Sequence, residues 1–164
     1  MPRLGDSILM IIRRAEPEER DRLRTFVQII VEEVYGHLWI GPSSGDGSLV
    51  ASRVESEDWS KAWVAFDGDT LVGTVLTQAQ WIDDLWVSRE YRGQGIGQQL
   101  LARGEAEIKA RDYSTLRLRV VKTNSRAVRF YERLGWKVEK EFLHETLCGV
   151  LMLELSKPAS AVAE

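Results

Sequence analysis

The sequence predicts a single mixed α/β domain. Its 164 residues are a usual length for one domain and leave no room for a second catalytic module. Hydrophobic residues make up 44% and charged residues 29% of the chain, which is ordinary for a globular protein and excludes disorder and low-complexity sequence. Runs with strand composition and runs with helical spacing follow one another in the order β-α-β-β-β-α-β-α-β-β, without an internal repeat. We therefore expect one mixed sheet with helices packed on it.

The first third of the chain predicts a strand, a helix and a loop. Met10–Arg14 reads as a short strand. Pro17–Glu19 opens a helix, because proline suits the first turn and acidic residues suit its positive end. Apolar residues at helical spacing carry this helix to about Tyr35 or Leu38. Gly41–Ser48 is rich in Gly, Pro and Ser, so it is the clearest loop.

A hairpin and a set of alternating elements follow. Ala62–Phe66 and Leu71–Thr77 flank the sequence Asp67-Gly68-Asp69, an Asp-Gly turn between two β-rich runs. The later elements are the strand Trp81–Val87, the helix Ile96–Arg111, the strand Leu116–Val121, the helix Ser125–Leu134 and the strands Trp136–Phe142 and Leu147–Leu155. We assign residues 1–157 to the domain and residues 158–164, which are small and polar, to a flexible C-terminal tail.

Charge is segregated along the chain. Residues 1–88 carry 8 basic and 15 acidic side chains, residues 89–140 carry 13 and 6, and residues 141–164 carry 1 and 4, for a net charge of −3. This favours an anionic ligand near the middle segment and a cationic ligand near the acidic flanks. The plain alternative is solvated charge scattered over helix faces.

Several classes of protein are excluded by the remaining composition. Cys148 is alone, so the chain has no internal disulfide. The apolar run Ile8–Ile12 is far too short to span a membrane and lacks a signal-peptide cleavage site. His37 and His144 are isolated, which argues against a metal site. We therefore expect a cytoplasmic protein with no membrane or nucleic-acid partner, whose six tryptophans supply a core or a homodimer surface.

The strongest motif is a glycine-rich loop between a predicted strand and a predicted amphipathic helix. It reads Arg92-Gly93-Gln94-Gly95-Ile96-Gly97-Gln98. Glycines let backbone N–H groups close on an anion, and the helix N-terminus adds partial positive charge, so the loop predicts a phosphate site. A tight strand-to-helix turn is the alternative. The glycine spacing does not fit a dinucleotide-binding fold, and the Gly-Lys-Ser/Thr of a P-loop is absent.

Two motifs in register resemble a known family. Arg92, Gly95 and Gly97 match the acetyl-CoA pyrophosphate loop of the GCN5-related N-acetyltransferases (GNAT). The segment Asn124–Trp136 is similar to the Asn…Ala…Phe-Tyr…Gly-Phe segment of that family. The resemblance implies a mostly antiparallel central sheet that is flanked by helices and splayed between its fourth and fifth strands. It also implies acetyl-CoA as the acyl donor.

The resemblance assigns the cofactor contacts residue by residue. Backbone of Leu85, Trp86 and Val87 would hydrogen-bond pantetheine, and the Val87 N–H would polarise the thioester carbonyl. The pyrophosphate would lie on the loop residues Arg92, Gly93, Gln94, Gly95, Ile96, Gly97 and Gln98. Asn124 and Ala127 would also contact the cofactor, although Asn124 is equally suited to be only a helix N-cap.

Tyr131 is the candidate general acid. A tyrosine on an apolar helix stripe is ordinarily a core residue. The resemblance instead implies that Tyr131 lies beside the cofactor sulfur and protonates the departing thiolate.

Asp83 is the candidate base or amine anchor. It and Asp84 interrupt an apolar strand, and strand alternation sends the two side chains to opposite faces. At least one carboxylate would then be buried, which is costly unless it is paired or lines a wet cavity. Asp83 matches the acidic position of some family members, notably the diamine acetyltransferase type, and Asp84 is held in reserve. The structural alternative is an ion pair with Arg117 or Arg119.

The predicted reaction is acetyl transfer to a primary amine. Acidic and aromatic residues stand where the family faces its acceptor, namely Glu32, Glu33, Tyr35, His37 and Trp39. These residues would suit an amine by charge and cation–π contact, although Glu32 and Glu33 are just as easily a solvated helix face. The acidic flanks and Asp83 favour a small cationic acceptor such as a polyamine, a basic amino acid or an aminoglycoside. The alternatives are a protein or peptide acceptor and a non-catalytic acyl-CoA-binding module.

Overall fold

A seven-stranded sheet forms the centre of the protein in the computed structural model, which describes residues 10–36, 58–145, 147 and 149–160. Its strands are β1 (Met10–Arg14), β2 (Trp63–Asp67), β3 (Thr70–Gln78), β4 (Trp81–Val87), β5 (Thr115–Val121), β6 (Lys137–Leu143) and β7 (Leu151–Pro158). They lie in the order β1-β2-β3-β4-β5-β7-β6, and neighbours are antiparallel except for the parallel pair β4 and β5. The predicted mixed, mostly antiparallel sheet is confirmed.

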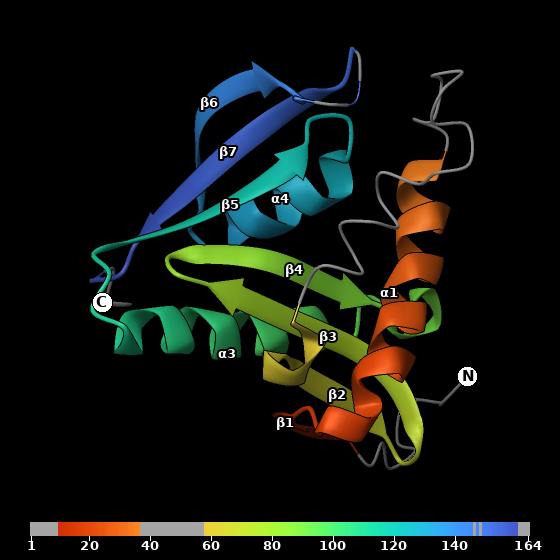
Figure 1. Ribbon diagram of the computed structural model, residues 1–164. Coiled ribbons are helices and arrows are strands. Elements are labelled where there is room, and N and C mark those ends of the chain that lie inside the picture. Colours follow the sequence, from red (N-terminus) through yellow and green to blue (C-terminus); the bar gives the residue numbers. More distant parts are fainter. Residues whose placement is uncertain (1–9, 37–57, 146, 148, 161–164) are drawn as a thin grey trace.

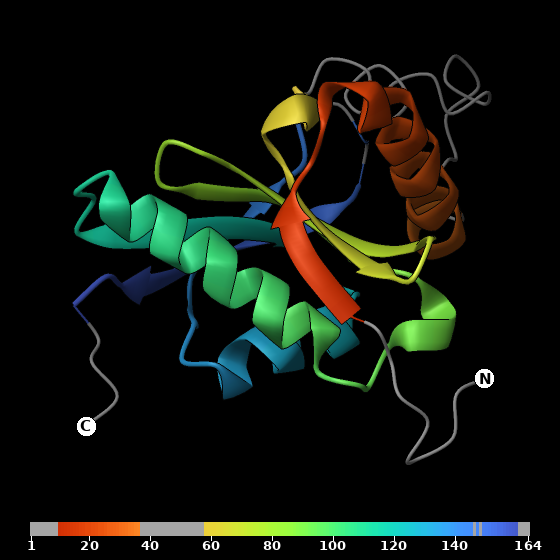
Figure 2. The same cartoon turned by 90° about the horizontal axis from the view of Figure 1, so that it is seen from below.

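Helices cover both faces of this sheet (Figure 1, Figure 2). α1 (Arg20–Tyr35) shares one apolar core with β2 and β3. α3 (Ile96–Ala110) and α4 (Ser125–Arg133) belong to a second core on the other face. α3 packs so closely that a Cβ on Gly104 would lie 2.9 Å from Cδ1 of Ile82. The sheet thus separates two apolar layers.

Local signals in the sequence explain where several elements begin. Short 3-10 helices at Pro17–Glu19, Trp59–Lys61 and Arg89–Tyr91 precede α1, β2 and α3. The Asp-Gly turn predicted between β2 and β3 is present, with Gly68 at a φ of 57°. The predicted order of strands and helices is therefore confirmed for the part of the chain that the structure describes.

The start of β7 was predicted too early. The sequence places it at Leu147, but the strand begins at Leu151. Gly149 has a φ of 78°, and the Val150 N–H donates to the Leu147 carbonyl at 3.3 Å. These residues belong to the turn between β6 and β7. The apolar run Leu147–Leu155 that was predicted as one strand therefore contains the end of the turn as well as part of β7.

The end of β7 reaches into the segment predicted as a tail. The strand continues to Pro158, and the Ala159 N–H donates to the Ser114 carbonyl at 2.9 Å. Residues 161–164 and Cys148 lie outside the described residues.

A β-bulge interrupts β4. Leu76 of β3 lies opposite Asp84, but the next residue, Thr77, lies opposite Ile82. The register therefore skips Asp83, which is the extra residue of the bulge. A bulge bends its strand and increases the local twist.

The pairing of β4 with β5 ends at this bulge. Only Trp81 and Ile82 of β4 lie opposite β5, against Arg117 and Leu118. Beyond Ile82 the two strands diverge, and in Figure 1 β5 and β7 rise away from β4. The splay expected between the fourth and fifth strands is confirmed.

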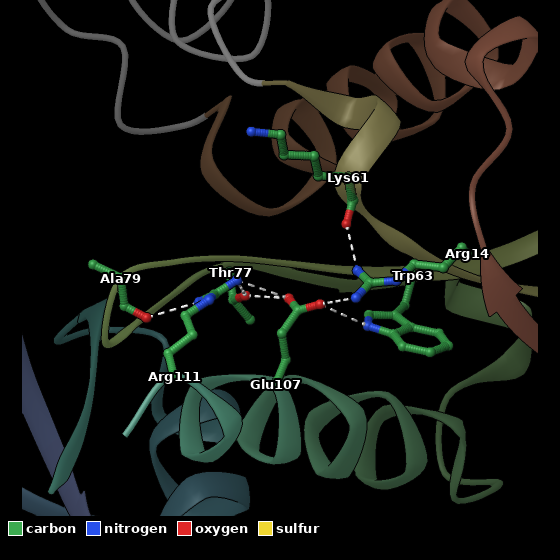
Figure 3. A network of polar contacts seen from close by, with 7 residues as sticks. All are labelled: Arg14, Lys61, Trp63, Thr77, Ala79, Glu107 and Arg111. Atoms are coloured by element: carbon green, nitrogen blue, oxygen red, sulfur yellow. Dashed lines mark hydrogen bonds and ion pairs between the residues drawn. The ribbon is translucent and has the colours of Figure 1, made fainter. Parts of the chain in front are cut away.

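A charged network fixes α3 to the first three strands (Figure 3). Glu107, whose side chain is 12% exposed, accepts hydrogen bonds from Trp63 Nε1 at 3.3 Å and Arg111 at 3.2 Å, and from the Thr77 hydroxyl. Arg14 forms an ion pair with the same carboxylate. Burial alone would raise the pKa of Glu107, but hydrogen bonds from Thr77 and Arg14 and the charges of both arginines hold this pKa below its usual value.

Removing the charge of Glu107 should destabilise the fold. In Glu107→Gln, two arginines lose their partner, and we expect the free energy of unfolding at pH 7 to fall by about 1–3 kcal/mol. The pKa of Glu107 is lower in the folded state than its ordinary value of 4.5. The stabilisation by the ionised carboxylate is therefore fully present above pH 4.5 and is lost as the pH falls through the folded-state pKa. Urea unfolding at several pH values should therefore show the wild-type advantage shrinking in acid. Glu132→Gln, at an exposed position of α4, is the matched control. Equal unfolding free energies for the two variants at pH 7 would contradict this role.

Candidate active site

Backbone N–H groups of β4 point into the gap between β4 and β5. The Ser88 N–H donates to the Val72 carbonyl at 2.9 Å, so these residues form a hydrogen-bonded pair of the ladder between β3 and β4. Such pairs alternate with non-hydrogen-bonded pairs in an antiparallel ladder. The N–H of Trp86 therefore faces β3, whereas those of Leu85 and Val87 point away from β3, toward β5. Of the three residues predicted to hydrogen-bond pantetheine through their backbone, Leu85 and Val87 thus point their N–H groups into the gap.

The glycine-rich loop is open at its surface. Gly93 and Gly95 have φ angles of 78° and 84°, which residues with a Cβ rarely adopt. A Cβ on either would meet nothing within 4 Å, so the space above the loop is free. Gly95 caps α3, and the N–H groups of Ile96, Gly97 and Gln98 in the first turn have no partner within the helix. With the positive end of the helix, these groups can hold an anion.

Side chains anchor this loop to the sheet. The Tyr91 hydroxyl donates to Asp67 at 2.8 Å, which ties the loop to the end of β2. Nε of Arg92 donates to the Val87 carbonyl at 3.1 Å. The Arg92 bond uses a carbonyl on the side of β4 that faces away from β3, so the loop and the gap are adjacent.

Three arginines lie near the loop, together with two carboxylates. Burial and the neighbouring charges of Arg126 and Arg89 lower the pKa of Arg92, and the carboxylates of Glu33 and Glu90 act in the opposite direction. Cations gathered at one place favour an anionic ligand. Sequence reasoning missed Arg126, although its position just after the predicted N-cap of α4 places it near a ligand at that helix end.

Asn124 joins two helices. Its Oδ1 accepts from the Ala127 N–H at 3.3 Å, so the predicted N-cap is present. Its Nδ2 donates to the Tyr35 hydroxyl at 3.0 Å. One side chain thus holds the first turn of α4 and the last turn of α1.

Tyr131 is buried in the second core. Its side chain is 9% exposed and meets the rings of Phe130 and Trp136 edge-on, with centroids 5.3 Å and 6.1 Å away. Burial, followed by the nearby groups of Tyr35 and Asp84, raises the pKa of Tyr131 well above its usual range. The phenol therefore remains protonated at neutral pH and has a proton to donate.

Asp84 is the more buried of the two adjacent carboxylates of β4. Asp84 is 6% exposed and accepts from Trp86 Nε1 at 3.0 Å. It is one of the groups that raise the pKa of Tyr131. Asp83 is half-buried at the bulge. The sequence favoured Asp83 because it matches the acidic position of some family members, with Asp84 held in reserve.

Arg117 and Arg119 have a carboxylate partner on β7. Both form ion pairs with Glu154, at 3.2 Å and 3.6 Å. Glu154 is itself buried, with a side chain 8% exposed. These two cations, proposed from the sequence as partners of a strand carboxylate, thus stabilise the packing of β5 against β7.

The residues predicted to face the acceptor lie at the end of α1. The Tyr35 ring is edge-on to Trp86, with centroids 6.2 Å apart and an interplanar angle of 81°. Glu32 and Glu33 are exposed on the same helix. The other two predicted residues, His37 and Trp39, lie outside the described residues.

The described residues contain no group of three or more His, Cys, Asp or Glu that could hold a metal ion. Nδ1 of His144 accepts from the Leu147 N–H at 3.0 Å in the turn before β7. Among the helices in the described parts of the chain, none is long and apolar enough to cross a membrane.

Comparison with known families identifies this arrangement. The model of the acetyltransferase (GNAT) family matches residues 23–136, from α1 to the end of the second motif. The chain belongs to the GNAT family. The resemblance read from the glycine loop and from Asn124–Trp136 is therefore confirmed.

Relatives of this GNAT chain act on different amines. It is 30% identical to the peptidyl-lysine N-acetyltransferase YjaB of Salmonella typhimurium over 80% of this chain and 86% of that protein. It is 39% identical to N-alpha-acetyltransferase 60 of Xenopus tropicalis over 49% of this chain, but it spans only 32% of that relative. The structure of the PaiA N-acetyltransferase of Thermoplasma acidophilum in complex with coenzyme A is similar to this chain, with a TM-score of 0.72 at 21% identity. The match covers 91% of this chain and 98% of the PaiA chain, and it supports the fold.

Proposed function

We propose that this GNAT member is an acetyl-CoA-dependent N-acetyltransferase that acetylates a primary amine by direct attack in a ternary complex. The observation that carries this proposal is the open edge of β4 beyond Ile82, where the N–H groups of Leu85 and Val87 point away from β3. The buried phenol of Tyr131 and the buried carboxylate of Asp84, whose charge acts on that phenol, are the candidate proton-transfer groups.

The donor site fits the residues present. When bound, acetyl-CoA supplies an acetyl thioester. The open glycine loop and the first turn of α3 would hold its pyrophosphate, with Arg92 and Arg126 nearby. The N–H groups of Leu85 and Val87 would hydrogen-bond the pantetheine arm in the gap.

Each group has a chemical task in the transfer. The amine nitrogen attacks the thioester carbonyl carbon, so that an N–C bond forms and the C–S bond breaks. The Val87 N–H stabilises the charge that builds on the carbonyl oxygen. Tyr131 donates its proton to the leaving sulfur. A carboxylate takes a proton from the ammonium, because an amine of pKa about 10.4 is otherwise protonated at neutral pH. The nitrogen loses its second proton as the amide forms, and this proton restores the Tyr131 phenol.

We assign the carboxylate role to Asp84 and retain Asp83 as the alternative. The charge of Asp84 reaches Tyr131 and helps to raise its pKa, and the nitrogen and sulfur that would exchange protons with these groups are both bonded to the same reacting carbon. The Trp86 indole fixes its orientation. The sequence favoured Asp83, and only the two variants compared side by side discriminate between them.

The acceptor proposed is a small cationic amine such as a polyamine, a basic amino acid or an aminoglycoside. Asp84 and the rings of Trp86 and Tyr35 suit an ammonium group by charge and cation–π contact. A second candidate is the lysine side chain of a peptide, which the similarity to the peptidyl-lysine enzyme of Salmonella typhimurium favours. A cytoplasmic location and a homodimer stay predictions.

Turnover of an amine should depend on Tyr131 and Asp84. We expect thiol release from acetyl-CoA with at least one pool of polyamines, amino acids, aminoglycosides or lysine peptides. Tyr131→Phe and Asp84→Asn should each lower kcat by roughly 10²–10⁴-fold, because each removes a proton-transfer group. A loss in Asp83→Asn with Asp84→Asn unaffected would move the role to Asp83. If acetyl-CoA raises the melting temperature but every pool stays inactive, the chain is an acyl-CoA-binding module and the proposal is wrong.

Binding of coenzyme A should depend on Gly95. A Cβ at Gly95 would strain the loop and enter the open space above it, so we expect Gly95→Ala to weaken coenzyme A binding in calorimetry by about tenfold or more. Gly68→Ala is the matched control, because Gly68 also has a positive φ, of 57°, but lies in the β2–β3 turn. Equal affinities for the two variants would place the pyrophosphate elsewhere.

A further inference from the structure

Two helices from opposite faces of the sheet are joined at the gap between β4 and β5. α1 belongs to one apolar core and α4 to the other. Nevertheless, Nδ2 of Asn124, the N-cap of α4, donates to the hydroxyl of Tyr35, in the last turn of α1, at 3.0 Å. The two residues are 89 positions apart in the chain. The bond therefore links the helix at the acceptor side to the helix that carries Tyr131.

Tyr35 is also close to both groups proposed to move protons. Its ring packs edge-on against Trp86, whose indole N–H donates to Asp84 at 3.0 Å. Its phenol is near enough to Tyr131 to contribute to the raised pKa of that residue. The Tyr35 side chain thus contacts Trp86, which holds Asp84. It also contacts Asn124, which caps the helix that carries Tyr131.

We propose that Tyr35 is a positioning residue for acetyl transfer, and that its hydroxyl acts by accepting the hydrogen bond from Asn124. The inference rests on the proposed function. With Nδ2 held by Tyr35, Oδ1 of Asn124 is directed at the Ala127 N–H, so the amide keeps one orientation. α4 has only nine residues, and a helix this short depends on its cap and tertiary contacts. Loss of the bond therefore loosens the first turn of α4 and shifts Tyr131 relative to the reacting sulfur.

A double-mutant cycle tests this role. Tyr35→Phe keeps the ring and its packing against Trp86 but removes the acceptor, and Asn124→Ser keeps a capping oxygen but removes the donor. We expect Tyr35→Phe to lower kcat about tenfold, with the KM for the amine and the Kd for coenzyme A changed by less than about twofold. In the Asn124→Ser background, the same Tyr35→Phe change should have no further effect on kcat, because the bond is already absent.

Tyr113→Phe, at an exposed position after α3, is the matched control and should leave kcat unchanged. Unchanged kcat in Tyr35→Phe, or losses that add in the double variant, would overturn the inference. Parallel losses of kcat, coenzyme A affinity and melting temperature in Tyr35→Phe would show a merely structural role and also overturn it. If the wild-type protein acetylates no amine, the proposed function itself is wrong. The role of Tyr35 in catalysis is then contradicted as well, and this result is distinct from those obtained with the variants.

Discussion

The β-bulge at Asp83 is the constraint on which the site depends. It ends the pairing of β4 with β5 after Ile82 and so leaves a gap inside the sheet. In an unbroken ladder the outward N–H groups of Leu85 and Val87 would bond to the next strand. Backbone N–H groups in a protein interior need a partner, so a strand that diverges at this point is prepared for a ligand that supplies acceptors.

The same gap brings together groups that the sheet otherwise separates. α1 and α4 pack into different cores, yet Asn124 donates to Tyr35, and the Tyr35 phenol is near enough to Tyr131 to contribute to its raised pKa. The glycine loop follows β4 directly and is bonded to it through Arg92 and the Val87 carbonyl. In the proposed function, donor-side and acceptor-side groups would meet at this position, as a reaction by direct attack requires.

Much of this arrangement could be predicted from the sequence. Periodicity and turn residues predict the order of elements, and two spaced motifs predict the family and the splayed strands. The bulge could not be predicted, because a single extra residue leaves an apolar strand looking continuous. The family resemblance favoured Asp83, whereas in the structure Asp84 is the carboxylate whose charge helps to raise the pKa of Tyr131. Contacts across 89 positions, such as that between Tyr35 and Asn124, are also invisible to local patterns.

The central claim is that the donor lies in the gap and bonds to the outward N–H groups of β4. Amide chemical shifts of the nitrogen-15 labelled protein during a coenzyme A titration test it most directly. We expect the largest shifts on β4 at Leu85 and Val87, with smaller shifts at Trp86, whose N–H faces β3. Shifts confined to β1 and β2, with Leu85 and Val87 unmoved at saturation, would contradict it.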